Sequence, residues 1–157
     1  MRAWGAVAAC AIALGCGQAE EGLDLRQIDE APVLPPPADA LEAEIRQRAP
    51  SEAMLMVPAE AVVRGELSEG QRRAFSAVLR AGLCYKVLGQ GGPGVQDLDV
   101  FAFDPDGVLL QRDAAEGPAP VVGVQRAICP VEPGLYRFEV RMAAGAGLYA
   151  AQVWVSQ

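Results

Sequence analysis

The sequence predicts an all-β domain, an antiparallel β-sandwich or barrel of about eight short strands, over residues 56–157. Within residues 61–155, apolar and polar residues alternate over short runs, and turns rich in glycine or proline separate these runs at intervals of roughly ten residues. The runs are joined by short connections without a helical period, which excludes the crossovers of a parallel sheet.

The clearest hairpin lies at residues 97–113. Residues 98–102 alternate as a half-buried strand does, and the segment Asp104-Pro105-Asp106-Gly107 then reverses the chain. Proline fixes φ at the first corner, aspartate accepts hydrogen bonds from nearby backbone, and glycine takes positive φ at little steric cost. Residues 108–110 are therefore predicted to return antiparallel.

The remaining strands are predicted from the same alternation. Residues 136–142 show the cleanest pattern, with Tyr136, Phe138, Val140 and Met142 facing inward and Arg137, Glu139 and Arg141 facing outward. A turn at residues 143–147 is expected to precede the last strand. The other predicted strands are residues 61–67, 73–79, 83–87 and 149–155, and residues 121–128 form either a strand or an extended connection.

The amino terminus carries the pattern of an export signal. Residues 1–15 have a short positive start and an apolar run too short to span a bilayer as a helix. Ala13-Leu14-Gly15-Cys16 resembles a bacterial lipoprotein signal, which implies that Cys16 is lipidated and anchors the protein to a membrane. Gly17 replaces the aspartate that retains enterobacterial lipoproteins in the inner membrane, so the outer membrane or cell surface is favoured. An ordinary signal peptide cut near Ala19 is the alternative.

Residues 16–55 are predicted to be an acidic, proline-rich, disordered tether that contains one short helix. The first part buries too little apolar surface to offset its ordering entropy. Asp39 can cap a helix over residues 39–48, in which Leu41 and Ile45 share a face and which Pro50 should end.

Composition restricts the function classes. The net charge is −7, with 20 acidic residues against 13 basic ones, which argues against binding nucleic acid by phosphate neutralisation. The chain has no histidine, threonine or asparagine, and none of its four serines lies in a nucleophile-elbow motif. We therefore expect a protein without catalytic residues, not an enzyme.

Cys84 and Cys129 are the two cysteines of the predicted domain. In an exported protein an oxidising compartment favours their pairing, so a structural disulfide is expected.

Five aspartates lie within seventeen residues, and carboxylates clustered on loops can hold calcium. The simpler interpretation is that they form turns and solvate the surface, because their spacing is not that of an EF-hand loop; we therefore favour no metal or other cofactor. A hydrolase with paired carboxylates is a remote alternative. The five residues are Asp97, Asp99, Asp104, Asp106 and Asp113.

Trp154 lies on the strand face opposite Tyr149 and Val153. It could be exposed, as a platform for a sugar ring or a protein contact, or it could be covered by the short helix.

Several stretches in order resemble the bacterial pre-peptidase C-terminal domain. They are G-E-L-x-x-G-Q at residues 65–71, D-L-D-V-F-A-F-D-P-D-G at 97–107, G-L-Y-R-F-E-V at 134–140 and G-L-Y-A-A-Q-V at 147–153. The resemblance covers residues 62–155 and implies a non-catalytic β-sandwich of jelly-roll type. Such domains are appended to secreted proteases and occur on surface proteins, although no protease domain accompanies this one.

The function that we expect is a non-catalytic, lipid-anchored envelope protein whose sandwich binds an envelope protein or a polysaccharide. The alternative is an accessory or structural domain for a separately encoded secreted hydrolase.

Overall fold

The computed structural model describes residues 37–113 and 115–157. The predictions for Cys16, the signal peptide and the tether before residue 37 lie outside these residues. No helix in the described part of the chain is long and apolar enough to cross a membrane. The described elements are α1 (Ala40–Glu52), β1 (Met56–Pro58), β2 (Val63–Ser68), β3 (Arg72–Leu79), β4 (Tyr85–Gly91), β5 (Val95–Phe103), β6 (Leu109–Arg112), β7 (Val121–Val122) and β8 (Gly134–Ser156).

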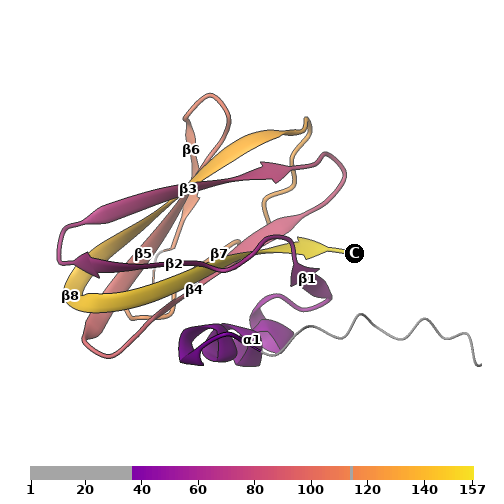
Figure 1. The fold of residues 1–157 in the computed structure, drawn as a ribbon. Helices are drawn as coiled ribbons and strands as arrows, with labels where there is room; N and C mark the ends of the chain where they lie inside the picture. The colour runs from indigo at the N-terminus through magenta and orange to yellow at the C-terminus, as the bar shows by residue number, and fades with distance from the viewer. Residues whose placement is uncertain (1–36, 114) are drawn as a thin grey trace, which may run out of the picture. The chain divides into compact units, whose positions relative to one another are not determined.

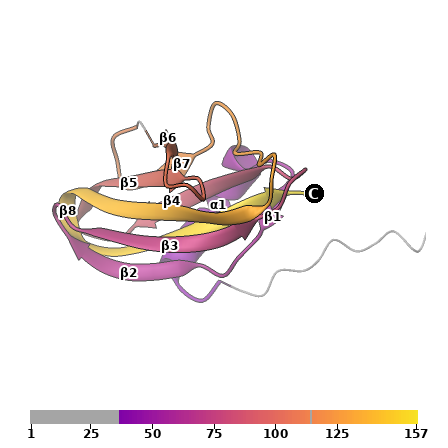
Figure 2. The ribbon, with the colours of Figure 1, turned by 90° about the horizontal axis from the view of Figure 1, so that it is seen from above.

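The strands form an antiparallel β-sandwich, as predicted (Figures 1 and 2). In sheet A, β1 and β2 pair with one side of β8, and β4 followed by β7 lies on its other side. In sheet B the order is β3, β8, β5, β6. Strand β8 therefore belongs to both sheets.

The prediction of a turn at residues 143–147 is wrong, because β8 runs continuously from one sheet into the other. Its first part pairs with β3 and β5, and its last part pairs with β2 and β4. The strand bends at Gly145, which has a φ of 86°, and a Cβ there would lie 2.3 Å from the carbonyl oxygen of Gly94. Only glycine fits this bend, so the glycines that suggest a turn instead let one strand change sheets.

The core lies between the two sheets and contains the residues predicted to face inward. Tyr136, Phe138, Val140 and Met142 are buried, and so are Tyr149 and the other inward residues of the last strand segment, Val155 excepted. Phe138 stacks on Phe75 of the edge strand β3, with ring centroids 5.3 Å apart.

The central hairpin forms with the predicted turn chemistry. Gly107 has a φ of 83°, and the Asp104 carboxylate accepts a hydrogen bond of 2.7 Å from the Val108 N–H. Strand β6 then returns antiparallel to β5. The Cys84–Cys129 disulfide is also confirmed, with an S–S distance of 2.02 Å.

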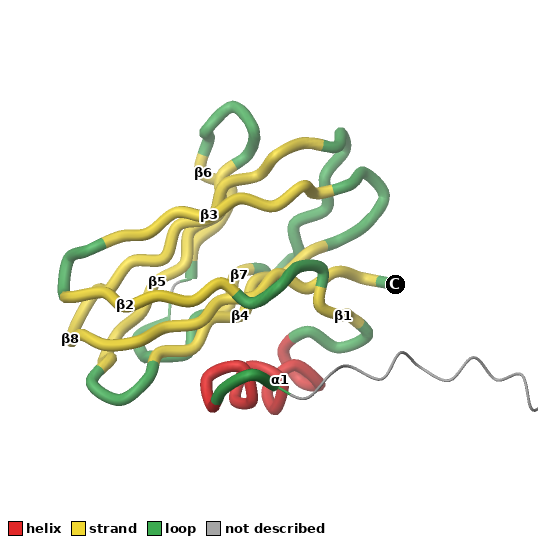
Figure 3. Tube along the Cα trace, in the orientation of Figure 1, coloured by secondary structure: helices red, strands yellow, loops and turns green. Residues whose placement is uncertain are grey.

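Helix α1 belongs to the folded unit and covers the outer face of sheet A (Figure 3). Asp39 caps it by accepting a hydrogen bond of 2.9 Å from the Glu42 N–H, as expected. The helix does not end at Pro50 but at Glu52. Proline removes one donor from the last turn, and the Ala53 N–H still bonds to the Ala49 carbonyl oxygen at 2.8 Å.

Trp154 is not an exposed binding platform. It is 4% exposed and lies in an apolar cluster with Ile45 and Ala49 of the helix and with Leu88 of β4. The prediction of an exposed indole is therefore wrong, and the alternative, that the short helix covers this face, is correct. The cause is simple: strand alternation places Trp154 outside the sandwich core, but the helix supplies a second core there.

Candidate binding surface

The outer face of sheet B carries arginine and phenylalanine side chains from neighbouring strands. No helix or strand of the described residues lies over it. Strand register places its side chains in rows across β3, β8, β5 and β6. We call this surface the arginine face. Its rows contain Arg72, Ala74, Ser76, Val78, Leu135, Arg137, Glu139, Arg141, Asp99, Phe101, Phe103, Leu109 and Arg112.

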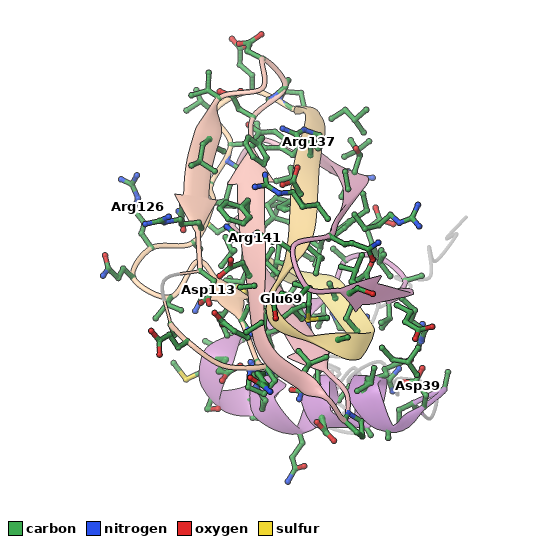
Figure 4. The ribbon with its side chains drawn as sticks, turned by 90° about the vertical axis from the view of Figure 1, so that its left-hand side faces the viewer. Asp39, Glu69, Asp113, Arg126, Arg137 and Arg141 are labelled. Carbon is green, nitrogen blue, oxygen red and sulfur yellow. A yellow bond between two sulfur atoms is a disulfide. The ribbon has the colours of Figure 1, made fainter. Side chains whose placement is uncertain are left out.

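Charge on the arginine face has the opposite sign to the charge of the chain. Four arginines lie against the two acids of these rows and the adjacent Asp97 on the same side of β5, a net charge of +1, whereas the whole sequence carries −7. The arginines are spread over three strands, so the positive charge covers the face rather than one strand. Figure 4 shows Arg137 and Arg141 along this side of the domain.

The ion pairs on the face leave cationic groups accessible. Glu139 is shared between Arg72 at 3.0 Å and Arg137 at 3.1 Å, so one carboxylate serves two guanidinium groups. Arg141 reaches Asp99 only at 3.9 Å. The arginine side chains of these pairs remain 38–57% exposed. Each can therefore donate additional hydrogen bonds to an anion.

Aromatic rings form the base of the positive surface. Phe101 and Phe103 are half-buried on the outer side of β5, between the buried Val100 and Ala102 that face the core. The Arg137 guanidinium lies 3.9 Å from the centroid of the Phe103 ring. Stacking on the ring fixes the plane of the guanidinium and limits the number of conformations that it loses when it binds a carboxylate.

Asp99 lies among these arginines, but its surroundings disfavour its ionised form. Burial, together with the nearby Asp97 carboxylate, raises the pKa of Asp99, although Arg141, Arg112 and Arg72 oppose the shift. The charged form of Asp99 is thus only partly compensated. This acid reduces the positive potential of the face without forming a strong ion pair.

The five aspartates considered as calcium ligands do not converge on one site, although Asp97 and Asp99 lie near each other. Asp97 accepts a hydrogen bond of 3.0 Å from the Gly117 N–H, and Asp113 accepts one of 3.2 Å from the Val121 N–H. Asp104 serves the hairpin turn, and Asp106 is exposed in that turn. Among the described residues, no group of three or more acidic or cysteine side chains is placed to hold a metal ion.

Sequence reasoning assigned the outward positions of Arg137, Glu139 and Arg141 but did not assign them a function. The arginine face depends on register between strands that are distant in the sequence, which alternation within each strand does not supply. The available signal was an arginine or phenylalanine at outward positions of two predicted strands, residues 98–102 and 136–142.

Comparison with known proteins adds no assignment: no protein-family model matches this sequence, and no curated protein matches it.

Proposed function

We propose that this chain is a non-catalytic, lipid-anchored protein of the cell envelope whose β-sandwich binds an anionic partner through the arginine face. One observation carries the proposal: a helix covers one outer sheet face, whereas no described element covers the other, which carries a net charge of +1 in an acidic chain. A face with exposed guanidinium groups on three neighbouring strands is suited to recognise carboxylates on an extended partner.

The membrane attachment rests on the sequence alone. Ala13-Leu14-Gly15-Cys16 supplies the lipoprotein-type signal, and the resemblance to pre-peptidase C-terminal domains supports a non-catalytic role at the surface. Cys16→Ala should move the protein from the detergent phase to the aqueous phase after phase separation. Unchanged partitioning would contradict the lipid anchor.

Binding can be tested with poly-L-glutamate as a carboxylate-rich probe. The protein should bind it, and the double variant Arg137→Gln with Arg141→Gln should bind at least about tenfold more weakly, because two charge-assisted contacts are removed. Binding should also weaken as salt is added. Arg126→Gln is the matched control, since Arg126 is exposed but lies outside the arginine face.

The melting temperature of each variant shows whether it remains folded. Equal binding by the double variant and the Arg126→Gln control would contradict a role for the arginine face.

A further inference from the structure

Strand β3 has an unpaired edge. It pairs with β8 along one side, and no other strand of the described residues pairs with it. The hydrogen-bond pattern between β3 and β8 determines which backbone groups of β3 are free. Met142 N–H bonds to the Gln71 carbonyl oxygen, and on the other side of the sheet Asp113 N–H bonds to the Val100 carbonyl oxygen. The alternation of antiparallel pairing then directs the N–H and C=O groups of four residues away from β8. These residues are Arg72, Ala74, Ser76 and Val78, and all four are exposed.

Beyond Arg72 and Arg73 at its start, this edge lacks the features that usually prevent strand addition. Edge strands in monomeric proteins are commonly short, bulged, or interrupted by proline or inward-pointing charge. Strand β3 is eight residues long, and its register with β8 continues without a shift from Arg72 to Leu79. Its last six residues, Ala-Phe-Ser-Ala-Val-Leu, contain no charge and no proline. Its free edge is therefore a complete template for another extended segment.

Charges at the two ends of β3 indicate what that segment is. Arg72 and Arg73 begin the strand, and Arg80 follows it directly. Arg73 and Arg80 form no ion pair within residues 37–113 and 115–157. An incoming strand with acids near both ends and an uncharged centre would match this distribution.

The same charges disfavour a second copy of the chain. Antiparallel pairing of β3 with itself through the free groups places Arg72 opposite or diagonal to Arg80 of the other copy. Like charges at these positions are destabilising. A partner with acidic ends avoids this repulsion.

Side chains beside the edge provide both faces for such a strand. On the outer side, Ala74, Ser76 and Val78 are exposed and continue into the arginine face. On the inner side, the half-buried Phe75 extends the core toward the edge. An added strand would therefore place one set of alternate side chains beside the arginine face and bury the other set against Phe75.

We propose that β3 binds an extended acidic polypeptide segment by strand addition, so that the partner becomes a further strand of sheet B. The inference rests on the proposed function, because it names the kind of anionic partner and the manner in which it binds. Backbone hydrogen bonds to β3 supply affinity, and acids opposite Arg72, Arg73 and Arg80 fix the register of the added strand.

The test uses a capped ten-residue peptide with two glutamates at each end and alternating valine and threonine between them. On binding, amide hydrogen exchange should slow at least about tenfold at Ala74, Ser76 and Val78, whose N–H groups become paired. The same peptide with N-methyl groups on all of its central residues should not bind, because neither of its edges can then complete the ladder. Replacing its glutamates by glutamines should weaken binding.

Ser76→Pro is the protein variant that isolates the edge. The Ser76 N–H points away from β8, so proline removes a free donor but no hydrogen bond to β8. Peptide binding should fall at least about tenfold. Ser76→Lys, which places a charge at the centre of the edge, gives a second test if the proline variant has a lowered melting temperature.

The outcomes separate this inference from the proposed function. Peptide binding that survives N-methylation and Ser76→Pro, but is lost in Arg137→Gln with Arg141→Gln, would overturn strand addition and leave an anion-binding face. A concentration-dependent dimer that Ser76→Pro abolishes would overturn it in favour of a second copy. Failure to bind either this peptide or poly-L-glutamate would contradict both proposals.

Discussion

The two outer faces of this sandwich are built from similar alternating strands, yet the described residues cover only one of them. On sheet A the outward residues include Leu88, Ala150 and Trp154, and these pack against helix α1. On sheet B the outward positions of β8 hold Leu135, Arg137, Glu139 and Arg141, and the face is open. The fold itself does not decide which face is covered; the residues at outward positions do.

The pKa shifts of acids also differ between the start of the covering helix and the open face. At the start of the covering helix, the Asp39 and Glu42 carboxylates share the Arg64 guanidinium. Hydrogen bonds from the Glu42 N–H and from Arg64 lower the pKa of Asp39. Burial alone would raise the pKa of Glu42, but hydrogen bonds from the Ala38 N–H, Arg46 and Arg64 lower it. On the open face the pKa of Asp99 is raised. The acids at the helix start are thus stabilised in their ionised form, whereas Asp99 on the open face is not.

The largest difference in stability between the covered and the open face is expected at Trp154. Trp154→Ala should lower the free energy of unfolding by about 3–5 kcal/mol, because it leaves a cavity beneath the helix. Leu135→Ala is the matched change on the same strand, at a position that is 60% exposed, and should alter it by less than about 0.5 kcal/mol. Urea unfolding measures both.

Similar effects of these two substitutions would show that α1 does not cover sheet A in solution. Trp154→Phe is a further control: it keeps an aromatic ring and removes an indole N–H that has no hydrogen-bond partner among the described residues. It should therefore cost less than Trp154→Ala.

The sequence predicted the sandwich because strand alternation and turn chemistry act locally. The Asp104–Gly107 turn and the inward set around Phe138 required no knowledge of the rest of the chain. The continuity of β8 and the burial of Trp154 could not be predicted in the same way. The first depends on contact between Gly145 and the backbone of Gly94, and the second depends on where a helix one hundred residues earlier packs.

The arginine face could be predicted only in part from the sequence. Outward arginines were recognised in the segment that became the first half of β8, but their proximity to Phe103 and Asp99 depends on the pairing of β8 with β5. A hydrophobic pattern specifies which side of each strand faces the core, and it does not specify which strands are neighbours.

A smaller effect is expected from the acid network at the helix start. Arg64→Gln should lower the free energy of unfolding at pH 7 by about 1 kcal/mol, since Glu42 is largely buried while Asp39 and Arg64 are partly solvated. Urea unfolding over a pH series measures the effect. Arg126→Gln, outside this network, is the control.

The stability difference between wild type and Arg64→Gln should depend on pH. Carboxylates whose pKa is lowered on folding stabilise the protein above their ordinary values, 3.8 for Asp39 and 4.5 for Glu42, and this stability is lost as the pH falls through the lowered values. The difference between wild type and Arg64→Gln should therefore shrink below about pH 4.5. A difference that stays constant down to pH 2 would show that Arg64 acts by packing alone.

The smallest predicted effect lies on the open face and has the opposite sign. The raised pKa of Asp99 means that its charge is less favourable in the folded state than in the unfolded one. Asp99→Asn should therefore raise the free energy of unfolding at pH 7, by about 0.5 kcal/mol. This gain should shrink as the pH falls through the raised pKa and disappear below 3.8, where wild-type Asp99 becomes neutral in both states. The same substitution makes the arginine face more positive, so poly-L-glutamate should bind more tightly. Destabilisation by Asp99→Asn at pH 7 would mean that the contact of 3.9 Å with Arg141 outweighs the cost of burying the Asp99 charge. Asp99 would then be stabilised in its ionised form, as Asp39 and Glu42 are at the helix start.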